Sequence, residues 1–292
     1  MHSLKMKLII IICFAALLLS FSCNGSHKEE EQSIDKKDTA KIILTDSSRG
    51  MDFSHYLDRT KKYEPVLIGK INHETGSFTQ GLFYFKGYLY ESTGLRGESS
   101  LRKLDTATGK VLKRISVAPE HFAEGMTILN NKIYQLTWLS NLCFVYDLET
   151  MNMIGSFNYE GEGWGLTNYN NLLVMSDGSN VLKFINPEDF QVVRQVSVFD
   201  GNQPVKNLNE LEMINGELFA NIWTEDRIVR IDPFTGNVIG YLDFTFLRKF
   251  IVNENVDVFN GIAYNHEKDI YYVTGKYWSY IFIVKLVELK NK

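Results

Sequence analysis

Five residues at equivalent places in the chain combine side chains that could move protons with side chains that could bind a polar ligand. They stand before a glycine or its positional equivalent and are called the first ring: Gln80, Glu124, Trp164, Asn209 and Asn260. Sheet packing alone would favour small or apolar residues at these positions. A carboxylate can take up and return a proton, and amides can orient a polar group.

A second set of residues follows the next apolar strand of each repeat and is called the second ring: Gly94, Trp138, Gly178, Trp223 and Lys276. Antiparallel neighbours place the end of one strand beside the start of the other, so both rings belong to one face. Together they offer one carboxylate, one lysine, several amides and three tryptophans. An apolar slot with a few convergent polar groups is the usual form of a small-ligand site.

Each of these residues also has a purely structural interpretation. A single tryptophan can pack between sheets, Glu124 can cap a turn, and Lys276 can be a solvated residue of the rim. Gln80, Asn209 and Asn260 can bond to backbone groups. Four further carboxylates are individually ambiguous, and the last two could orient the rings from behind: Glu160, Glu162, Glu210 and Glu212. The coincidence of so many polar and aromatic residues on one face favours a site.

Internal repeats indicate the elements that position the two rings. Each repeat has a short strand beginning near a glycine, a turn, a second apolar strand and two more strands. Their spacing of roughly 40–50 residues is typical of a four-stranded propeller blade. The five repeats begin at Phe78–Gly81, Phe122–Gly125, Glu162–Gly165, Asn207–Glu210 and Val258–Gly261.

The fifth repeat lacks a fourth strand of its own. The first four repeats each have one, at Gly109–Leu112, Asn152–Gly155, Gln191–Val193 and Asn237–Gly240. Pro65–Lys70 has the right pattern to complete the last blade and remove its open edge. The sequence therefore predicts an all-β fold, a five-bladed β-propeller closed by an N-terminal strand.

The N-terminal residues are predicted to direct export. Lys5 and Lys7 precede an apolar run from Leu8 to Leu19 that is too short to span a bilayer comfortably. Leu19–Cys23 is similar to a bacterial lipoprotein signal, with Cys23 as the lipidated residue; plain secretion is the alternative. We therefore expect a signal peptide at 1–23, a polar tether at 24–62, and a propeller domain at 63–292. The protein would be periplasmic or on the cell surface, anchored to a bacterial membrane only through lipid.

Charge and cysteine content exclude several classes of function. The formal net charge is −4 and the lysines and arginines form no stripe, which argues against a nucleic-acid partner. Cys13 and Cys23 lie in the signal segment, which leaves Cys143 as a small buried residue without a disulfide partner. No motif histidine accompanies the single central carboxylate, so we expect no metal and no other cofactor.

Eight motifs in chain order allow a comparison with a known family. They are Phe78–Leu82, Glu124–Thr127, Gln135–Trp138, Glu162–Thr167, Leu208–Glu212, Asn221–Trp223, Asp257–Ala263 and Val273–Lys276. With them the chain resembles the glutaminyl-peptide cyclotransferases of the plant and bacterial type, which are unlike the zinc-dependent animal cyclases. The resemblance spans nearly the whole propeller domain, and the chain departs from the family pattern at none of these positions.

The resemblance implies an acyltransferase that converts the N-terminal glutamine of peptides and proteins into pyroglutamate and releases ammonia, and we expect it to be a monomer. It implies Glu124 as proton shuttle, with Asn209 and Lys276 near the developing oxyanion. The substrate pocket would be lined by Phe78, Gln80, Phe122, Trp138, Trp164 and Trp223, to which the first ring adds Asn260.

The residue types fit this reaction independently of the resemblance. An α-amino group, with a reference pKa of about 7.7–8.0, must lose a proton to attack the side-chain amide carbon, and a carboxylate can take that proton and later protonate the leaving nitrogen. Two other classes remain open. A carbohydrate- or peptide-binding propeller would release no ammonia, and a metal-dependent propeller hydrolase or lactonase would be sensitive to chelators.

Overall fold

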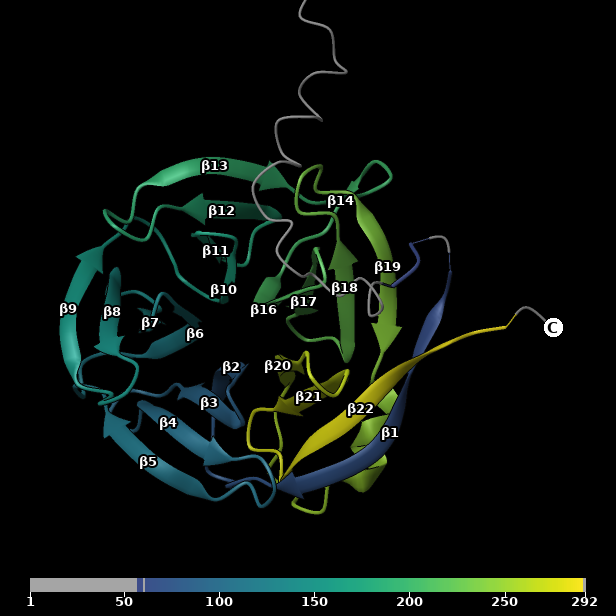
Figure 1. The fold of residues 1–292 in the computed structure, drawn as a ribbon, viewed down its shortest axis with the longest axis horizontal. Helices are drawn as coiled ribbons and strands as arrows, with labels where there is room; N and C mark the ends of the chain where they lie inside the picture. The colour runs from purple at the N-terminus through teal and green to yellow at the C-terminus, as the bar shows by residue number, and fades with distance from the viewer. Residues whose placement is uncertain (1–56, 60, 291–292) are drawn as a thin grey trace, which may run out of the picture. The chain divides into compact units, whose positions relative to one another are not determined.

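Five four-stranded antiparallel sheets surround a common axis in the computed structural model, which describes residues 57–59 and 61–290 (Figure 1). Blade one is β2 (Thr79–Phe85), β3 (Tyr88–Thr93), β4 (Ser100–Asp105) and β5 (Val111–Ser116). Blade two is β6 (Ala123–Leu129), β7 (Lys132–Thr137), β8 (Leu142–Asp147) and β9 (Met153–Asn158). Blade three is β10 (Leu166–Tyr169), β11 (Leu172–Met175), β12 (Val181–Ile185) and β13 (Val192–Ser197). Blade four is β16 (Leu208–Ile214), β17 (Glu217–Ile222), β18 (Arg227–Ile231) and β19 (Val238–Asp243).

Blade five combines the two ends of the domain. It contains β20 (Phe259–Asn265), β21 (Ile270–Gly275), β22 (Tyr280–Glu288) and, outermost, β1 (Tyr63–Asn72). β1 pairs antiparallel with β22 from Tyr63 opposite Glu288 to Asn72 opposite Tyr280. The predicted five-bladed propeller and its closure by an N-terminal strand are thus confirmed, and the closing strand is longer than the predicted Pro65–Lys70.

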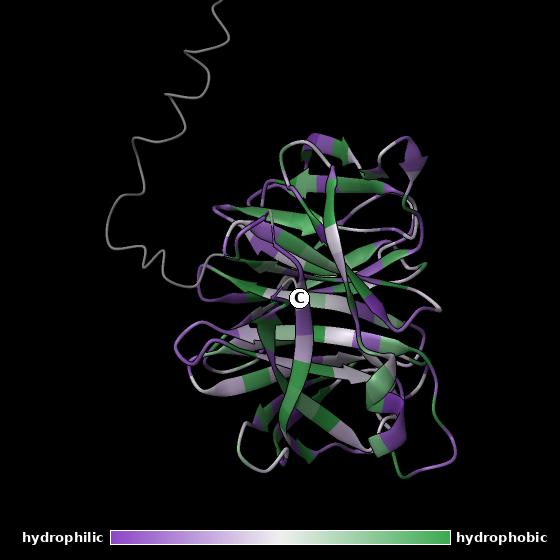
Figure 2. Cartoon of the chain, turned by 90° about the vertical axis from the view of Figure 1, so that its right-hand side faces the viewer, coloured by the Kyte–Doolittle hydropathy of each residue, from purple (hydrophilic) through white to green (hydrophobic). Residues whose placement is uncertain are grey.

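Burial changes from the axis to the periphery of each blade. All seven residues of β6 and of β20 are buried, whereas β1 alternates between half-buried and exposed residues apart from the buried Ile71. This difference follows from position, since an innermost strand is covered by neighbouring blades and an outermost strand is covered on one face only. Figure 2 shows the resulting apolar segments along the strands. Among residues 57–59 and 61–290, no helix is long and apolar enough to cross a membrane.

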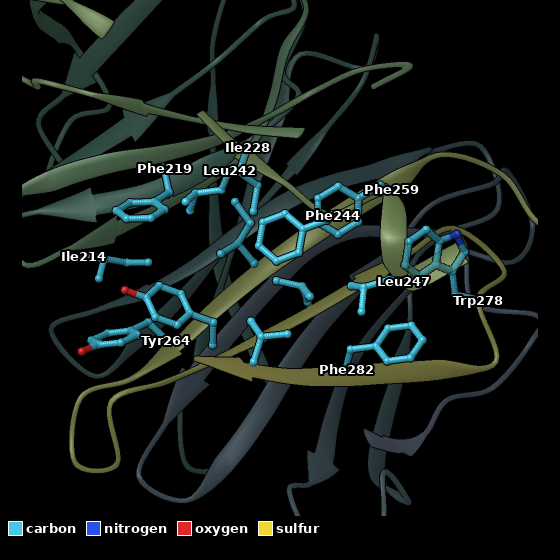
Figure 3. Close-up of a cluster of buried hydrophobic side chains, with 14 residues drawn as sticks. Ile214, Phe219, Ile228, Leu242, Phe244, Leu247, Phe259, Tyr264, Trp278 and Phe282 are labelled. Carbon is cyan, nitrogen blue, oxygen red and sulfur yellow. The ribbon is translucent and has the colours of Figure 1, made fainter. Parts of the chain in front are cut away.

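Apolar clusters between neighbouring blades hold the ring together. The cluster between blades four and five includes Phe219, Phe244, Phe259, Trp278 and Phe282 (Figure 3). Phe244 precedes a 3-10 helix, η2 (Thr245–Phe250), in the connection between the two blades. A short ribbon of β14 (Phe199–Asp200) and β15 (Gln203–Pro204) lies in the preceding connection, between blades three and four.

Residues just before the closing strand also contact the propeller. Leu57 packs against the cluster of blades four and five, and Arg59 forms ion pairs with Asp232 and, at 3.4 Å, with Glu217. Lys61 pairs with Glu288 at 2.8 Å. The end of the segment expected to be a tether therefore lies on the domain surface. The signal peptide, Cys23 and the rest of the tether lie outside the described residues.

A buried charged cluster joins the closing blade to blade one. The Nε2 atom of His73 lies 2.8 Å from Oε1 of Glu91, and its Nδ1 lies 2.8 Å from the carbonyl oxygen of Trp278. Arg102 approaches the second carboxylate oxygen of Glu91 at 3.5 Å. Burial raises the pKa of Glu91, but His73 and Arg102 beside it hold that pKa below its ordinary value. The connection from β1 to β2 is thereby fixed on both sides.

Removal of the closing strand should abolish cooperative folding, because it exposes the edge of β22 and part of the core. We expect a chain starting at Tyr63 to unfold cooperatively with a small loss of stability, because it lacks only the surface contacts of Leu57, Arg59 and Lys61. A chain starting at His73 should show no cooperative transition. Urea unfolding followed by near-ultraviolet circular dichroism compares the two, and equal midpoints would contradict the closure by β1.

Candidate active site

Irregular pairing of the innermost strands presents four of the first-ring side chains. The register between first and second strands shifts at Gln80, at Glu124 and Gly125, at Asn209 and Glu210, and at Asn260 and Gly261. A bulge of this kind removes a residue from the regular alternation and redirects its side chain. Trp164, the fifth member, instead precedes β10 in a loop.

The glycines that follow three of the first-ring residues are required by the neighbouring blade. A Cβ atom on Gly81 would lie 2.6 Å from the backbone nitrogen of Met126, and one on Gly125 would lie 2.5 Å from that of Leu166. A Cβ on Gly165 would lie 1.9 Å from the carbonyl oxygen of Asn209. At these three junctions the start of one blade therefore touches the backbone of the next. This close approach explains why glycine recurs at these positions of the sequence.

Blade four departs from the pattern, because Glu210 follows its first-ring residue in place of glycine. The two carboxylate oxygens of Glu210 accept hydrogen bonds from Leu82 N at 3.1 Å and Ile262 N at 2.8 Å. Glu210 thus connects blade four to blades one and five, and burial raises its pKa well above the ordinary value. This placement answers the ambiguity in the sequence: Glu210 supports the innermost strands.

The second ring lies beside the start of the innermost strands through a repeated backbone hydrogen bond. The four bonds are Gly94 N to Phe78 O at 2.8 Å, Trp138 N to Phe122 O at 2.9 Å, Trp223 N to Asn207 O at 2.8 Å, and Lys276 N to Val258 O at 2.9 Å. In blade three, Gly178 instead accepts from Asn207 N at 2.8 Å. Both rings therefore lie at the same end of the propeller axis, as the antiparallel pairing predicts.

Glu124 is the central acid of the site and is only 5% exposed. Burial raises its pKa well above the ordinary glutamate value, and the negative charge of Glu162 raises it further. Lys276 and a hydrogen bond from Gln80 oppose this shift. A buried carboxyl group with a raised pKa can exchange protons at a higher pH than a surface glutamate.

Lys276 is the cation that faces this acid, and it is also 5% exposed. Burial lowers its pKa, while the negative charges of Glu124 and Asp257 act in the opposite direction. Its Nζ lies 4.5 Å from the centroid of the Phe78 ring. An ammonium group above an aromatic face gains a cation–π interaction that partly replaces lost hydration.

Asn209 is held by its backbone and has a free side-chain oxygen. The hydroxyl of Ser176 donates to its carbonyl oxygen at 2.7 Å and accepts from Gly165 N at 2.8 Å. Its own Oδ1 is buried and has no partner among the described residues. Buried polar atoms are normally satisfied, so an orphan beside the other first-ring residues is available to a ligand.

The aromatic residues form an arc around one side of the site. The ring centroids of Phe78 and Phe122, and those of Phe122 and Trp138, are 5.8 Å apart, in edge-to-face contacts. The same distance separates Trp164 from Trp223, which is 42% exposed. All six residues predicted from the resemblance to line the pocket, together with Asn260, have contacts in this arc or in the polar group around Glu124.

Two residues contribute to the site although the sequence did not assign them a role in it. Glu162 Oε2 accepts from the indole nitrogen of Trp138 at 2.6 Å and from that of Trp164 at 2.9 Å, so it joins the two halves of the arc. Tyr277 lies edge-on to Phe78 at 5.2 Å. In the sequence, Glu162 is one of four ambiguous carboxylates and the first residue of a family motif, whereas Tyr277 gives no signal beyond its place after Lys276.

The part of the chain that the structure describes contains no cluster of metal-binding side chains. No three histidine, cysteine, aspartate or glutamate side chains gather there in a way that could hold an ion. Cys143 is buried, and burial raises the pKa of its thiol. The groups available at this site are therefore the carboxyl groups of Glu124 and Glu162, one ammonium group and several amides, surrounded by aromatic side chains.

These features define a five-bladed propeller with an acid–base site at one end of its axis. The family model described as glutamine cyclotransferase matches residues 39–286, and the chain belongs to this family. It is 36% identical over 251 residues to a glutaminyl-peptide cyclotransferase of Arabidopsis thaliana, covering 84% of this chain and 77% of that protein. It is 35% identical to the glutaminyl cyclase of Myxococcus xanthus, whose crystal structure matches with a TM-score of 0.74 over 79% of this chain and 99% of that one.

Space for the aromatic arc depends on a second-ring glycine. A Cβ on Gly94 would lie 2.3 Å from Cε1 of Phe122. Gly94→Ala should therefore displace this ring and lower the free energy of unfolding by about 1–3 kcal/mol. Gly155→Ala is the matched control, since a Cβ at Gly155 meets nothing within 4 Å. Urea unfolding compares the two variants with the parent; equal losses would contradict the proposed contact.

Proposed function

We propose that the protein cyclises the N-terminal glutamine of peptides and proteins to pyroglutamate, with release of ammonia. The observation that carries the proposal is Glu124, a buried carboxyl group with a raised pKa beside a buried lysine. Family membership supports the same reaction. In this reaction one C–N bond forms between the α-nitrogen and the side-chain amide carbon, and the original amide C–N bond breaks.

Glu124 is assigned the movement of the proton. Its ionised form removes a proton from the α-ammonium group, which allows the nitrogen to attack the amide carbon. The acid so formed then protonates the leaving nitrogen, which departs as ammonia, and the nitrogen of the new ring releases its remaining extra proton to the solvent. The raised pKa suits both steps, because the group is neither too weak a base nor too weak an acid near neutral pH.

Lys276 and Asn209 are assigned the oxygen that becomes negative in the tetrahedral intermediate. An ammonium group and an amide N–H in a water-poor site stabilise such an oxyanion without having to reorganise. The aromatic arc then has two tasks. It excludes water and holds the flexible glutamine side chain close to a ring-like conformation, an orientation effect that can contribute several kcal/mol.

Replacement of the acid tests the assignment directly. Glu124→Gln keeps the size of the side chain but cannot carry a proton, so kcat for a Gln-initiated peptide should fall by about 10²–10⁴-fold. The fold should persist, as measured by the melting temperature. Glu120→Gln is the control, because its side chain is 67% exposed. A Glu124→Gln enzyme within a few-fold of the parent rate would refute the role of Glu124.

The pH dependence of kcat should respond to the charges of Glu162 and Lys276 around Glu124. Activity rises as Glu124 ionises, so the acid limb of kcat should lie above the ordinary glutamate pKa of 4.5. Glu162→Gln removes a negative neighbour and should move the limb to lower pH. Lys276→Met removes a positive neighbour and should move it to higher pH. Ammonia release measured across pH gives the limb, and a shift of either variant in the opposite direction contradicts this electrostatic scheme.

We further propose that the protein is exported and anchored through lipid on Cys23. Leu19–Cys23, at the end of the short apolar run, supports this proposal. Cys23→Ser should then release the protein from the membrane fraction of the expressing bacterium, and mass spectrometry of the parent should show an acylated N-terminal peptide. An unmodified N-terminus in the parent would favour plain secretion instead.

A further inference from the structure

The orientation of the Gln80 amide can be worked out from the backbone atoms around it. Asn260, which is fully buried, places its Nδ2 atom 3.1 Å from the carbonyl oxygen of Thr79. A carbonyl oxygen can only accept a hydrogen bond, so this atom of Asn260 has to be the NH2 group. Asn260 therefore has a single orientation.

The second hydrogen of that NH2 group fixes Gln80 in turn. The Nδ2 atom of Asn260 lies 3.3 Å from Gln80, and the atom it meets has to be the acceptor, Oε1. The NH2 group of Gln80 consequently points the other way, and Gln80 donates a hydrogen bond to Glu124. In the flipped orientation, two NH2 groups would face each other and the Gln80 oxygen would face a carboxylate.

We propose that Asn260 is a positioning residue, which holds the Gln80 amide so that its NH2 group faces the carboxylate of Glu124. The chain of hydrogen bonds crosses three blades, from β20 through β2 to β6. This inference rests on the proposed function, in which Glu124 moves the proton. It assigns to Asn260 a task that differs from direct contact with the substrate.

The consequence of this arrangement is electrostatic. A donor aimed at a carboxylate favours its ionised form. The charged groups that act on Glu124 are Lys276 from blade five and Glu162 from the loop before β10. Tyr159 also faces this acid, and the charge of Glu124 adds in small part to the pKa of Tyr159, which burial raises. Lys276 and the Gln80 donor favour ionisation of Glu124, whereas burial and the negative charge of Glu162 oppose it. Loss of the donor should raise the pKa of Glu124.

A double-mutant cycle tests the chain of hydrogen bonds. Asn260→Leu, Gln80→Met and the double variant are compared with the parent by the acid limb of kcat for a Gln-initiated peptide. Each single variant should move the limb to higher pH. The double variant should move it no further than Gln80→Met alone, because Asn260 acts only through Gln80.

Asn221→Leu is the matched control. Asn221 is a fully buried amide that accepts from Gly261 N at 3.0 Å, so it supports the same strand without reaching Gln80. It should lower the melting temperature and leave the limb in place. Additive shifts in the cycle, an unmoved limb in Asn260→Leu, or an equal shift in Asn221→Leu would each overturn the role of Asn260.

A measurement on the unaltered protein covers the case in which Asn260→Leu does not fold. The side-chain N–H resonances of Gln80 should titrate with the acid limb of the parent enzyme, and constant resonances would overturn the proposal. These results are separable from the proposed function. A parent that releases no ammonia from a Gln-initiated peptide contradicts the function, whereas an active parent with an additive cycle contradicts only the role of Asn260.

Discussion

Direct contact between the backbones of the innermost strands is the constraint on which the propeller and its site both depend. At Gly81, Gly125 and Gly165 a single added carbon would meet the next blade at 2.6 Å or less. Because no side chain fits between the strands at these points, the residues before the glycines turn toward the axis. The close approach that packs the ring therefore also gathers Gln80 and Glu124 at one end of it.

This arrangement has an electrostatic cost, which is concentrated along the axis. Burial raises the pKa values of Glu124, Glu210 and Glu212 well above the ordinary value. Each of these groups lowers the free energy of unfolding as pH rises from the ordinary glutamate pKa to the raised pKa of the folded state. The reason is that the carboxyl group ionises more easily in the unfolded chain. Backbone donors offset part of the cost at Glu210. At Glu124, the same cost yields a carboxyl group that is useful in proton transfer.

Closure of the ring and organisation of the site meet at the junction between blades five and one. β1 completes blade five from the N-terminal side, and His73 in the next connection is fixed between Trp278 and Glu91. Thr79 and Gln80 then follow, and Asn260 of blade five bonds to both of them. The closing strand thus sets the distance between two blades whose amides have to meet. A ring left open here would lose that alignment.

The sequence by itself determined the propeller, its closing strand and the membership of both rings. Strand periodicity, glycine position and repeat spacing are local properties, so Glu124, Lys276 and Pro65–Lys70 could be placed by counting. The tertiary structure decided how these residues act on one another. Glu162 joins Trp138 to Trp164, and Asn260 orients Gln80. Glu210 stands where the other repeats have glycine and accepts hydrogen bonds from the innermost strands of two other blades. Those roles depend on distances between separate blades and on whether the NH2 group or the oxygen of an amide meets a backbone carbonyl. The spacing of residues along one strand determines neither.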